Sequence, residues 1–355
     1  MADNTTIQIA LPSDQGYFHG LMVTATSIVL YANPVSPLRF HVLDGGLADE
    51  SFDRLERHLR GLRSNVSVVR HRIDTGKFDR FPAWSRNRMT YARLLLPELL
   101  PDADFVIYTD TDVLWLAAVD DLWAKADDRT PAWTVRDGVA ETRDRENVWF
   151  DAHGLPCPGD DYFCAGVMLF NLRCFREEQI AGQALAFIER HPDLLFADQT
   201  AMNHLLYRRV GLLPEPWQTL TLNLSPEALS APVVLHYANE IPWKRTTRWG
   251  LLSDSVMIWH GFNDRFVLRR PGASLKRFYP LHERLQKRLL YMLLLWKLPQ
   301  ALCFRMLARM RRDDIIASLR PYLNALGRRR LAGLRAEWER KSSALAAFHK
   351  DVASV

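Results

Sequence analysis

The first 70 residues alternate between short apolar runs and amphipathic segments, and this alternation is the strongest constraint on the fold. The apolar runs have the length and β-branched content of buried strands, whereas the segments between them repeat apolar residues at helical spacing. The expected strands are Ile7–Leu11, Leu38–Leu43 and Val66–Arg70, and the expected helices are Tyr17–Tyr31 and Asp49–Arg60. The order strand, helix, strand, helix, strand predicts the nucleotide-binding half of a doubly wound α/β domain.

A further apolar run, Phe105–Tyr108, stops just before Asp110-Thr111-Asp112. The run predicts a buried strand, and open α/β sheets bind their ligands beyond the carboxyl ends of their strands. Side chains two residues apart on an extended chain share a face, so Asp110 and Asp112 are candidates to hold one divalent cation together with a diphosphate. The alternative is a solvated turn, because short Asp-x-Asp patterns arise by chance in a chain with 41 acidic residues.

Two other polar positions allow either a binding or a structural role. The loop Pro12–Gly16 follows the first strand, and its Asp14 is a candidate to accept a hydrogen bond from a base or a ribose. Alternatively, Ser13 or Asp14 only caps the helix that follows. Arg93 belongs to a helix expected over Arg86–Leu100, where it either reaches a phosphate or is an ordinary surface charge.

The middle of the chain is expected to complete the domain. Residues 131–160 are rich in Pro, Gly and charge, and they predict a mobile loop over a site. The small residues Cys164-Ala165-Gly166 leave room for a ligand to approach the backbone, and a strand over Val167–Leu172 follows them. A helix is expected over residues 175–190.

Two later elements carry further candidate site residues. Asp198 opens a short helix, and a late strand over Val233–Tyr237 carries His236 near its end. A histidine on an apolar strand is either a metal ligand or an ordinary buried histidine, and the strand pattern alone does not decide between these roles.

Charge is divided unevenly along the chain. Residues 281–355 contain 16 Lys/Arg and 6 Asp/Glu, a net charge of +10, which leaves −5 for the first 280 residues. Apolar residues recur among the basic ones at helical spacing, as at Leu331, Leu334 and Trp338. Basic amphipathic helices suit an anionic membrane surface, and the alternative is a helical appendage that packs on the body. No nucleic-acid partner is expected, because no nucleic-acid-binding motif is present.

Length and cysteine usage limit the class of protein. A chain of 355 residues is long enough for one large domain with an appendage, which we expect over residues 1–280 and 281–355. No apolar run reaches the ~18–20 residues of a membrane span, and the start of the chain has no signal-peptide pattern. The four cysteines show no zinc spacing. These features predict a cytoplasmic protein with reduced thiols, peripheral on the inner face of the cytoplasmic membrane.

Several stretches, taken in order, resemble the family 8 glycosyltransferases, especially the bacterial lipopolysaccharide galactosyl- and glucosyltransferases. They are distributed between residue 7 and about residue 250. The resemblance implies the GT-A fold, in which a Rossmann-like nucleotide-binding half continues into a mixed central sheet; here a basic helical tail would follow it. The stretches are Ile9–Tyr17, Arg39–Gly46, Thr90–Arg93, Tyr108–Val113, Phe163–Leu172, Asp198–Gln199, His236–Tyr237 and Pro242–Trp243.

The resemblance implies a retaining transferase that moves a hexose, galactose or glucose, from a UDP-sugar to a lipopolysaccharide-core, lipid-linked or other glycan acceptor. It implies that Asp110, Asp112 and His236 bind Mn²⁺, with Mg²⁺ as the alternative ion, and an imidazole ligand favours Mn²⁺. Asp198 and Gln199 are the implied catalytic pair below the donor sugar. The other implied donor-binding residues are Pro12, Ser13, Asp14, Thr90, Arg93, Thr111, Cys164, Ala165 and Gly166.

Some positions depart from the family pattern. Cys164 stands where Asn or Ser is usual, Gly16 replaces a common Asn, Thr200 replaces a frequent Asp, and Ile241 falls near the place of a diphosphate-binding lysine. Lys244 or Arg245 is expected to replace that lysine. Unchanged UDP affinity in variants that remove these charges would contradict this expectation. The departures keep two alternatives open: a catalytically degenerate sugar-nucleotide-binding protein, and a transferase that acts on a protein or polysaccharide.

Overall fold

The computed structural model describes residues 6–82, 88–221, 233–238, 241–243 and 254–270. The chain forms two compact units, Met1–Asn223 with Ala231–Ala238, and Leu224–Ser230 with Asn239–Val355. The first unit holds both sheets and the expected catalytic, metal-binding and donor-binding residues other than Lys244 and Arg245. The expected basic tail, and the proposed diphosphate-binding positions Lys244 and Arg245, lie outside the described residues.

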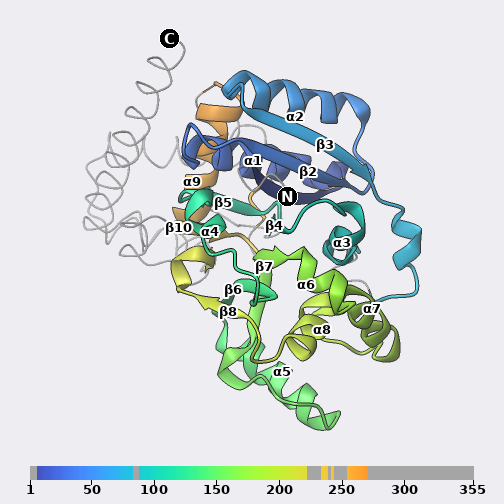
Figure 1. Ribbon diagram of the computed structural model, residues 1–355. Coiled ribbons are helices and arrows are strands. Elements are labelled where there is room, and N and C mark those ends of the chain that lie inside the picture. The colour runs from blue at the N-terminus through green and yellow to red at the C-terminus, as the bar shows by residue number, and fades with distance from the viewer. Residues whose placement is uncertain (1–5, 83–87, 222–232, 239–240, 244–253, 271–355) are drawn as a thin grey trace, which may run out of the picture. The chain divides into compact units, whose positions relative to one another are not determined.

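A seven-stranded mixed sheet of order β3-β2-β1-β4-β7-β6-β8 forms the centre of the first unit (Figure 1). Strands β1 to β4 run parallel, and β7 is antiparallel to both β4 and β6. The central strands β4 and β7 are buried at every residue, as their unbroken apolar sequences require. The strands are β1 Ile7–Ser13, β2 Leu38–Asp44, β3 Val66–Arg72, β4 Phe105–Thr109, β6 Ala132–Arg136, β7 Phe163–Asn171 and β8 Gly211–Leu213.

Helices α1 (Phe18–Tyr31) and α2 (Asp49–Leu62) connect the first three strands, as the alternation predicts. Nearly all of α1 is buried, whereas α2 buries only Leu55 and Leu59 and keeps its charged residues outside. The hydroxyl of Thr24 in α1 lies 2.6 Å from the carbonyl oxygen of Val113 and 3.0 Å from that of Thr111. A polar side chain on this buried helix therefore anchors the segment that carries the two aspartates.

A second, three-stranded sheet of order β5-β10-β9 adjoins the Asp-x-Asp turn. Its strands are β5 Val113–Leu116, β9 Thr219–Leu220 and β10 Val233–His236. Strand β10 is antiparallel to β5, and His236 lies opposite Val113. The backbone N–H of Tyr237 donates to the carbonyl of Asp112 at 2.8 Å. Because β5 begins directly after Asp112, this pairing brings the end of β10 to the aspartates.

Helices cover the other half of the large sheet. Helix α7 packs against α8, and α8 against β7 (Figure 1). The short helix that Asp198 was expected to open is confirmed as α8. The longer helices of this half are α5 Ala140–Ala152, α6 Leu172–Glu177, α7 Ile180–Arg190 and α8 Ala197–Leu205. Short elements elsewhere in the unit are η1 Gln15–Tyr17, η2 Thr75–Phe78, η3 Met89–Leu95, α3 Leu96–Leu99, α4 Val119–Trp123, η4 Gly159–Asp161 and η5 Glu215–Gln218.

The predicted helix over Arg86–Leu100 is wrong for the residues that the structure describes. A 3₁₀ helix, η3, is followed by the short helix α3. Pro97 has no N–H to donate to the carbonyl of Arg93, and the N–H of Leu96 donates to that carbonyl instead. The tighter turn changes the helical phase before the proline.

Two further predictions are corrected. Residues 131–160 are not a loop: they contain strand β6 and helix α5. The buried positions of α5 are Glu146, Trp149 and Phe150, and a charged residue in this set hides the helical pattern. The predicted helix over 175–190 is divided into α6 and α7 at Gln179, whose φ of 54° lies in the left-handed region.

In the second unit, helix α9 (Asp254–Phe262) continues into the π-helical turn η8 (Asn263–Val267). The rings of Trp243 and Trp259 lie 5.3 Å apart within this unit. None of the helices formed by the described residues has the length and apolar content needed to cross a bilayer.

Candidate active site

The strand order creates a crevice at the carboxyl ends of β1 and β4. These two strands are parallel neighbours, with Ile9 opposite Ile107. The chain leaves β1 toward β2 on one side, and it returns from β3 to β4 on the other. Such a reversal of strand order is where open α/β sheets bind their ligands. The end of β1 therefore lies beside Asp110, which follows β4 directly.

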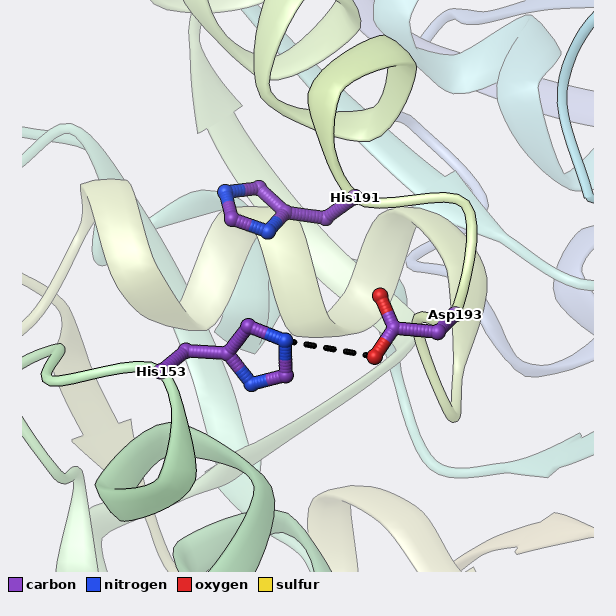
Figure 2. Close-up of side chains that lie close together, drawn as sticks. All are labelled: His153, His191 and Asp193. Atoms are coloured by element: carbon purple, nitrogen blue, oxygen red, sulfur yellow. Dashed lines mark ion pairs between the residues drawn. The ribbon is translucent and has the colours of Figure 1, made fainter.

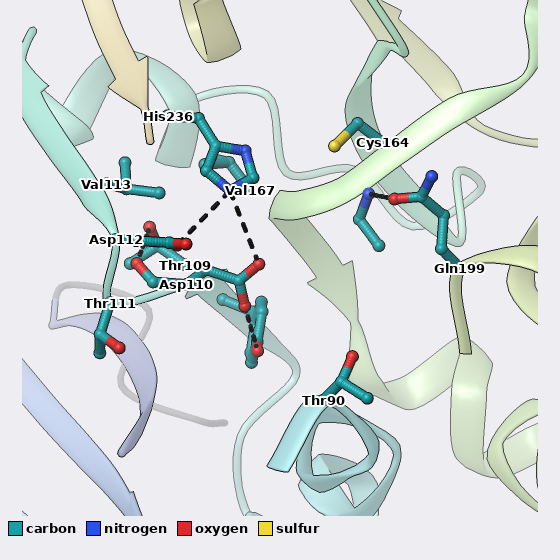
Figure 3. Close-up of polar contacts among 12 residues, drawn as sticks. Thr90, Thr109, Asp110, Thr111, Asp112, Val113, Cys164, Val167, Gln199 and His236 are labelled. Carbon is teal, nitrogen blue, oxygen red and sulfur yellow. Dashed lines mark hydrogen bonds and ion pairs between the residues drawn. The ribbon is translucent and has the colours of Figure 1, made fainter. Parts of the chain in front are cut away.

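Asp110, Asp112 and His236 converge at this crevice (Figure 3). The Nε2 atom of His236 lies 3.4 Å from Oδ1 of Asp112 and 4.0 Å from Oδ2 of Asp110. One ligand atom from each side chain lies within 4.8 Å of the other two. The His236 side chain is 6% exposed, whereas that of Asp110 is 25% exposed. The cluster is therefore sheltered but retains contact with solvent through a carboxylate.

The electrostatics of this cluster favour a cation. Burial alone would lower the pKa of His236, but the hydrogen bond and charge of Asp112 hold it well above its usual value. Burial raises the pKa of Asp110, against the lowering effect of Arg93, and the charge of Asp112 raises it further. In both cases the nearby negative charge stabilises a bound proton, and it would stabilise a divalent cation for the same reason.

Gly166 makes room for the cluster. A Cβ atom at this position would lie 2.4 Å from Cε1 of His236, 2.8 Å from Nδ1 of His236 and 3.2 Å from Oδ2 of Asp110. The carbonyl of Gly166 also accepts the backbone N–H of Asp110 at 2.8 Å. The space that the sequence suggested for a ligand beside residues 164–166 is thus filled, at Gly166, by the His236 ring.

Arg93 lies between two buried carboxylates. It is 4% exposed, and its Nη2 donates to Oδ1 of Asp110 at 3.1 Å. Its Nε lies 2.9 Å from Oδ2 of Asp198, although the Nε–H donates to the carbonyl of Thr90. Its Nη1 donates to the carbonyl of Ala165. Arg93 is therefore not a surface charge: it holds Asp110 and Asp198 in place, and a contact to the donor phosphate stays a prediction.

Gln199 is fixed at both ends of its amide. Its Oε1 accepts the backbone N–H of Ala165 at 2.9 Å, and its Nε2 donates to the hydroxyl of Tyr162 at 3.2 Å and to Oδ2 of Asp137 at 3.3 Å. Asp137, directly after β6, is 5% exposed, and burial raises its pKa. Sequence reasoning missed Tyr162 and Asp137. Asp137 could have been found from the Asp-Gly pair that follows a short strand, but we interpreted this segment as a loop.

The remaining candidate residues surround this network. Pro12, Ser13 and Thr111 are buried beside the crevice, and the hydroxyl of Ser13 donates to the carbonyl of Asp14. The Oδ1 atom of Asp14 accepts the N–H of Tyr17, so the capping role is confirmed, and a nucleotide contact stays a prediction. Thr90 donates to Asp198.

Two departures from the family pattern also have a place in the structure. Figure 3 shows the Cys164 side chain pointing toward the His236 ring, and Cys164 contributes to the raised pKa of that histidine. Thr200 is buried, and its hydroxyl accepts the backbone N–H of Phe196 at 3.1 Å, which ties the start of α8 together. A frequent acidic position is thus occupied here by a residue with a local structural contact.

Glu146 is a buried acid near Tyr162 and Thr200. It lies on α5 and is fully buried. Burial raises its pKa to about 7, although Thr200 and Tyr162 lower it in part. Sequence reasoning missed this residue as well, because an acid on a charged helix gives no signal of burial.

Replacing Glu146 by Gln is expected to remove a pH-dependent loss of stability. An unfolded chain releases this proton near a pKa of 4.5, whereas the folded chain holds it to about 7, so stability falls as the pH rises through this interval. The cost amounts to about 3 kcal/mol above pH 7. Glu146→Gln should therefore exceed the wild type most at alkaline pH in urea unfolding. Glu141→Gln, at an exposed position of the same helix, is the control, and equal stability of Glu146→Gln and wild type at pH 8 would contradict the prediction.

Comparisons with known proteins agree with this architecture. The sequence profile "Glycosyl transferase family 8" matches residues 8–247. General stress protein A of Bacillus subtilis (strain 168) is 24% identical over 269 residues, 70% of this chain and 91% of that protein. Glucoside xylosyltransferase 2 of Mus musculus is 29% identical over 164 residues, 44% of this chain and 36% of that protein, so the chain matches about a third of its length. The crystal structure of the galactosyltransferase LgtC with donor and acceptor sugar analogs is 26% identical, has a TM-score of 0.61, and is matched over 74% of this chain and 96% of LgtC.

The matched segment contains both sheets, the Asp-x-Asp turn, α8 and the end of β10. For the described residues, the likeness to LgtC and the mixed seven-stranded sheet confirm the predicted α/β GT-A fold. The family profile covers well over half of the chain. The resemblance expected from the sequence is therefore confirmed, and the chain belongs to glycosyl transferase family 8.

Proposed function

We propose that this glycosyltransferase is a retaining enzyme that moves galactose or glucose from a UDP-sugar to a glycan acceptor with the help of a divalent cation. The observation that carries the proposal is the convergence of Asp110, Asp112 and His236 at the crevice between β1 and β4. Magnesium prefers an all-oxygen shell, whereas manganese accepts an imidazole readily. We therefore assign Mn²⁺ to these residues, with Mg²⁺ as the alternative.

The three side chains would hold the ion against the diphosphate of the donor. When bound, the cation would neutralise the charge that develops on the UDP leaving group. The chain itself keeps Oδ2 of Asp110 facing His236, because Arg93 and Tyr108 both donate to the other oxygen, Oδ1. Ligands that are fixed before the substrate binds need little reorganisation during the reaction.

Asp198 and Gln199 are assigned to the donor sugar. The Oδ2 atom of Asp198 is buried 2.9 Å from Nε of Arg93 but accepts no hydrogen bond from the described residues, so we assign it to a sugar hydroxyl. An amide is a poor nucleophile, and the Oε1 atom of Gln199 already accepts the N–H of Ala165. We therefore propose that the acceptor hydroxyl attacks from the face that UDP leaves, which retains the α configuration. The protein then contributes positioning and charge rather than a covalent intermediate.

The identities of the donor sugar and of the acceptor are separate proposals. LgtC is named a galactosyltransferase and the mouse relative a glucoside xylosyltransferase, so UDP-xylose belongs among the donors to be tested. Cys164, in place of the usual Asn or Ser, would change the contacts to sugar hydroxyls. For the acceptor we propose a lipopolysaccharide-core or other lipid-linked glycan, and a protein or polysaccharide is the alternative.

Release of UDP from the donor tests the proposal. With Mn²⁺ and a panel of UDP-glucose, UDP-galactose, their N-acetyl forms and UDP-xylose, we expect metal-dependent UDP release from one donor. Asp110→Asn with Asp112→Asn should lower the rate by at least about a thousandfold, because both removed charges act on the developing diphosphate charge. Asp102→Asn, in the exposed turn before β4, is the matched control and should leave the rate unchanged.

The outcomes separate the alternatives. Release that is unaffected by the double substitution would contradict the assigned metal ligands. Mn²⁺-dependent UDP binding without release from any donor, even with a glycan acceptor present, would favour the degenerate sugar-nucleotide-binding protein. Ile241 is the reason to consider that alternative, because it stands near the position where the family has a diphosphate-binding lysine. A chain that binds no UDP at all would contradict both proposals.

We also propose that residues 281–355 bring the transferase domain, residues 1–280, to an anionic membrane surface on its cytoplasmic side. The net charge of +10 in this segment supports the proposal. The full chain should sediment with vesicles that contain phosphatidylserine but not with phosphatidylcholine vesicles, and salt should weaken the binding. Replacing Arg328, Arg329 and Arg330 by Gln should weaken it as well. Equal binding to both kinds of vesicle would contradict an electrostatic surface association.

A further inference from the structure

A second group of metal-ligating side chains lies outside the candidate active site. His153, His191 and Asp193 each offer one ligand atom within 4.8 Å of the other two (Figure 2). The Nε2 atom of His153 lies 3.2 Å from Oδ2 of Asp193. Nothing in the proposed transfer reaction uses these residues. The three come from different parts of the fold: the end of α5, the end of α7 and the turn that leads to α8.

A buried tryptophan holds the three side chains in position. Trp149 is 6% exposed, and its ring stacks on that of His153 with centroids 4.0 Å apart. Its edge-on contact with the His191 ring is at 5.6 Å, and its indole N–H donates to Oδ2 of Asp193 at 3.0 Å. Because one buried ring contacts all three side chains, it restricts their conformations and keeps them close together.

The hydrogen bond of His153 selects the ring tautomer whose Nε2 atom can bind a metal. Its Nδ1 lies 2.8 Å from the carbonyl oxygen of Trp149, which can only accept, so Nδ1 carries a proton. The lone pair of a neutral ring is then on Nε2, the atom that faces Asp193. Metal-binding histidines commonly donate their other N–H to a carbonyl in this way.

The backbone also favours a cation here. His153 is the C-terminal cap residue of α5, and His191 is that of α7. Helix C-termini carry a partial negative charge, because their last carbonyl groups point outward without intrahelical partners. Two such ends and one carboxylate meet at this place. The alternative to a bound cation is a protonated His153 that pairs with Asp193. This pair would neutralise part of the negative charge, but it would not explain why His191 lies beside it.

We propose that His153, His191 and Asp193 form a second metal site, one that takes Zn²⁺ or a similar transition-metal ion. Two imidazoles and a carboxylate, with a water in the fourth position, are a tetrahedral zinc set. Ligand atoms in such a shell lie about 3.4 Å apart. The pair His153–Asp193 is close to this spacing at 3.2 Å, and the ligand atom of His191 lies within 4.8 Å of both.

The site acts as a clamp rather than as a centre of chemistry. A bound ion joins the ends of α5 and α7 to the turn at Asp193. Residues 194–196 alone separate this turn from α8, whose first turn carries Asp198 and Gln199. Metal binding would therefore restrain the segment that positions the residues assigned to the donor sugar.

Zinc binding to the full chain tests the proposal. Metal-free protein that carries Asp110→Asn and Asp112→Asn, and so lacks the other cluster, is titrated with Zn²⁺ against a chromophoric chelator. We expect one tightly bound Zn²⁺ per chain and a rise in Tm on loading, because the ion binds the folded state. Adding His191→Ala, or in a separate variant Asp193→Asn, should weaken the affinity at least about tenfold and abolish the rise in Tm.

The control is His58→Ala, which removes a histidine that contacts Thr26 far from this cluster in sequence. It should bind Zn²⁺ like the parent. Asp193 is exposed, so its substitution by Asn tests the site even if His191→Ala fails to fold. A weaker affinity in either cluster variant, with His58→Ala unchanged, supports the site. The same affinity in the parent and in both cluster variants would overturn it.

Discussion

Replacing Arg93 by methionine is expected to destabilise the protein by about 3–5 kcal/mol, the usual effect of removing one partner of a buried ion pair. Methionine fills much of the same volume but leaves Asp110 and Asp198 without their cation. Asp198 is 1% exposed, and its charge has no solvent to replace the guanidinium. Urea-induced unfolding of the metal-free protein measures the loss. The expected large effect follows from the desolvation of the partners, and not from the number of hydrogen bonds.

Two further variants make the prediction specific. Arg173→Met breaks an ion pair with Asp128 whose side chains are 39% and 75% exposed, and it should cost about 0–1 kcal/mol. Adding Asp198→Asn to Arg93→Met removes one of the stranded charges and should recover part of the lost stability. A loss for Arg93→Met no larger than that for Arg173→Met would show that Asp110 and Asp198 do not need the buried cation.

Two of the metal-site candidates could be identified from the sequence because each lies at the end of a recognisable strand. Asp110 follows the apolar run of β4, and His236 closes the apolar run of β10. Their meeting could not be derived from the same patterns, since it depends on β10 pairing with β5 so that His236 lies opposite Val113. Strand register is a long-range property, and only the family resemblance placed the histidine beside the aspartates before the structure did.

The residues that sequence reasoning missed share a physical cause. Asp137, Glu146 and Tyr162 lie in or beside the segment 131–160, where strand β6 is only five residues long and a buried acid obscures the pattern of helix α5. Polar groups at buried positions interrupt the hydrophobic periodicity from which helices and strands are predicted. Arg93 is a related case: a helix phase based on Arg86–Leu100 could not show that a 3₁₀ turn directs this side chain inward.

Gly166 gives the second large expected effect. In Gly166→Ala the new methyl group would lie 2.4 Å from Cε1 of the His236 ring, so the ring or strand β7 has to shift. The ring is buried and offers little room, and such overpacking costs about 1–3 kcal/mol of stability. Because His236 and Asp110 border the same space, we expect the affinity for Mn²⁺ in the presence of UDP to fall about 10–100-fold. Electron paramagnetic resonance of free Mn²⁺ measures this affinity directly.

Gly182→Ala is the matched control for this substitution. Gly182 lies within α7, and a Cβ atom there would meet no other atom within 4 Å. The change should leave Mn²⁺ affinity unaltered and stabilise the helix slightly, because alanine is the better helix former by about 1 kcal/mol. Both substitutions add the same methyl group, so a difference between them reports the lack of room around residue 166. Unchanged Mn²⁺ affinity in Gly166→Ala would mean that the ion does not depend on His236 in its present position, and it would remove the histidine from the proposed ligand set.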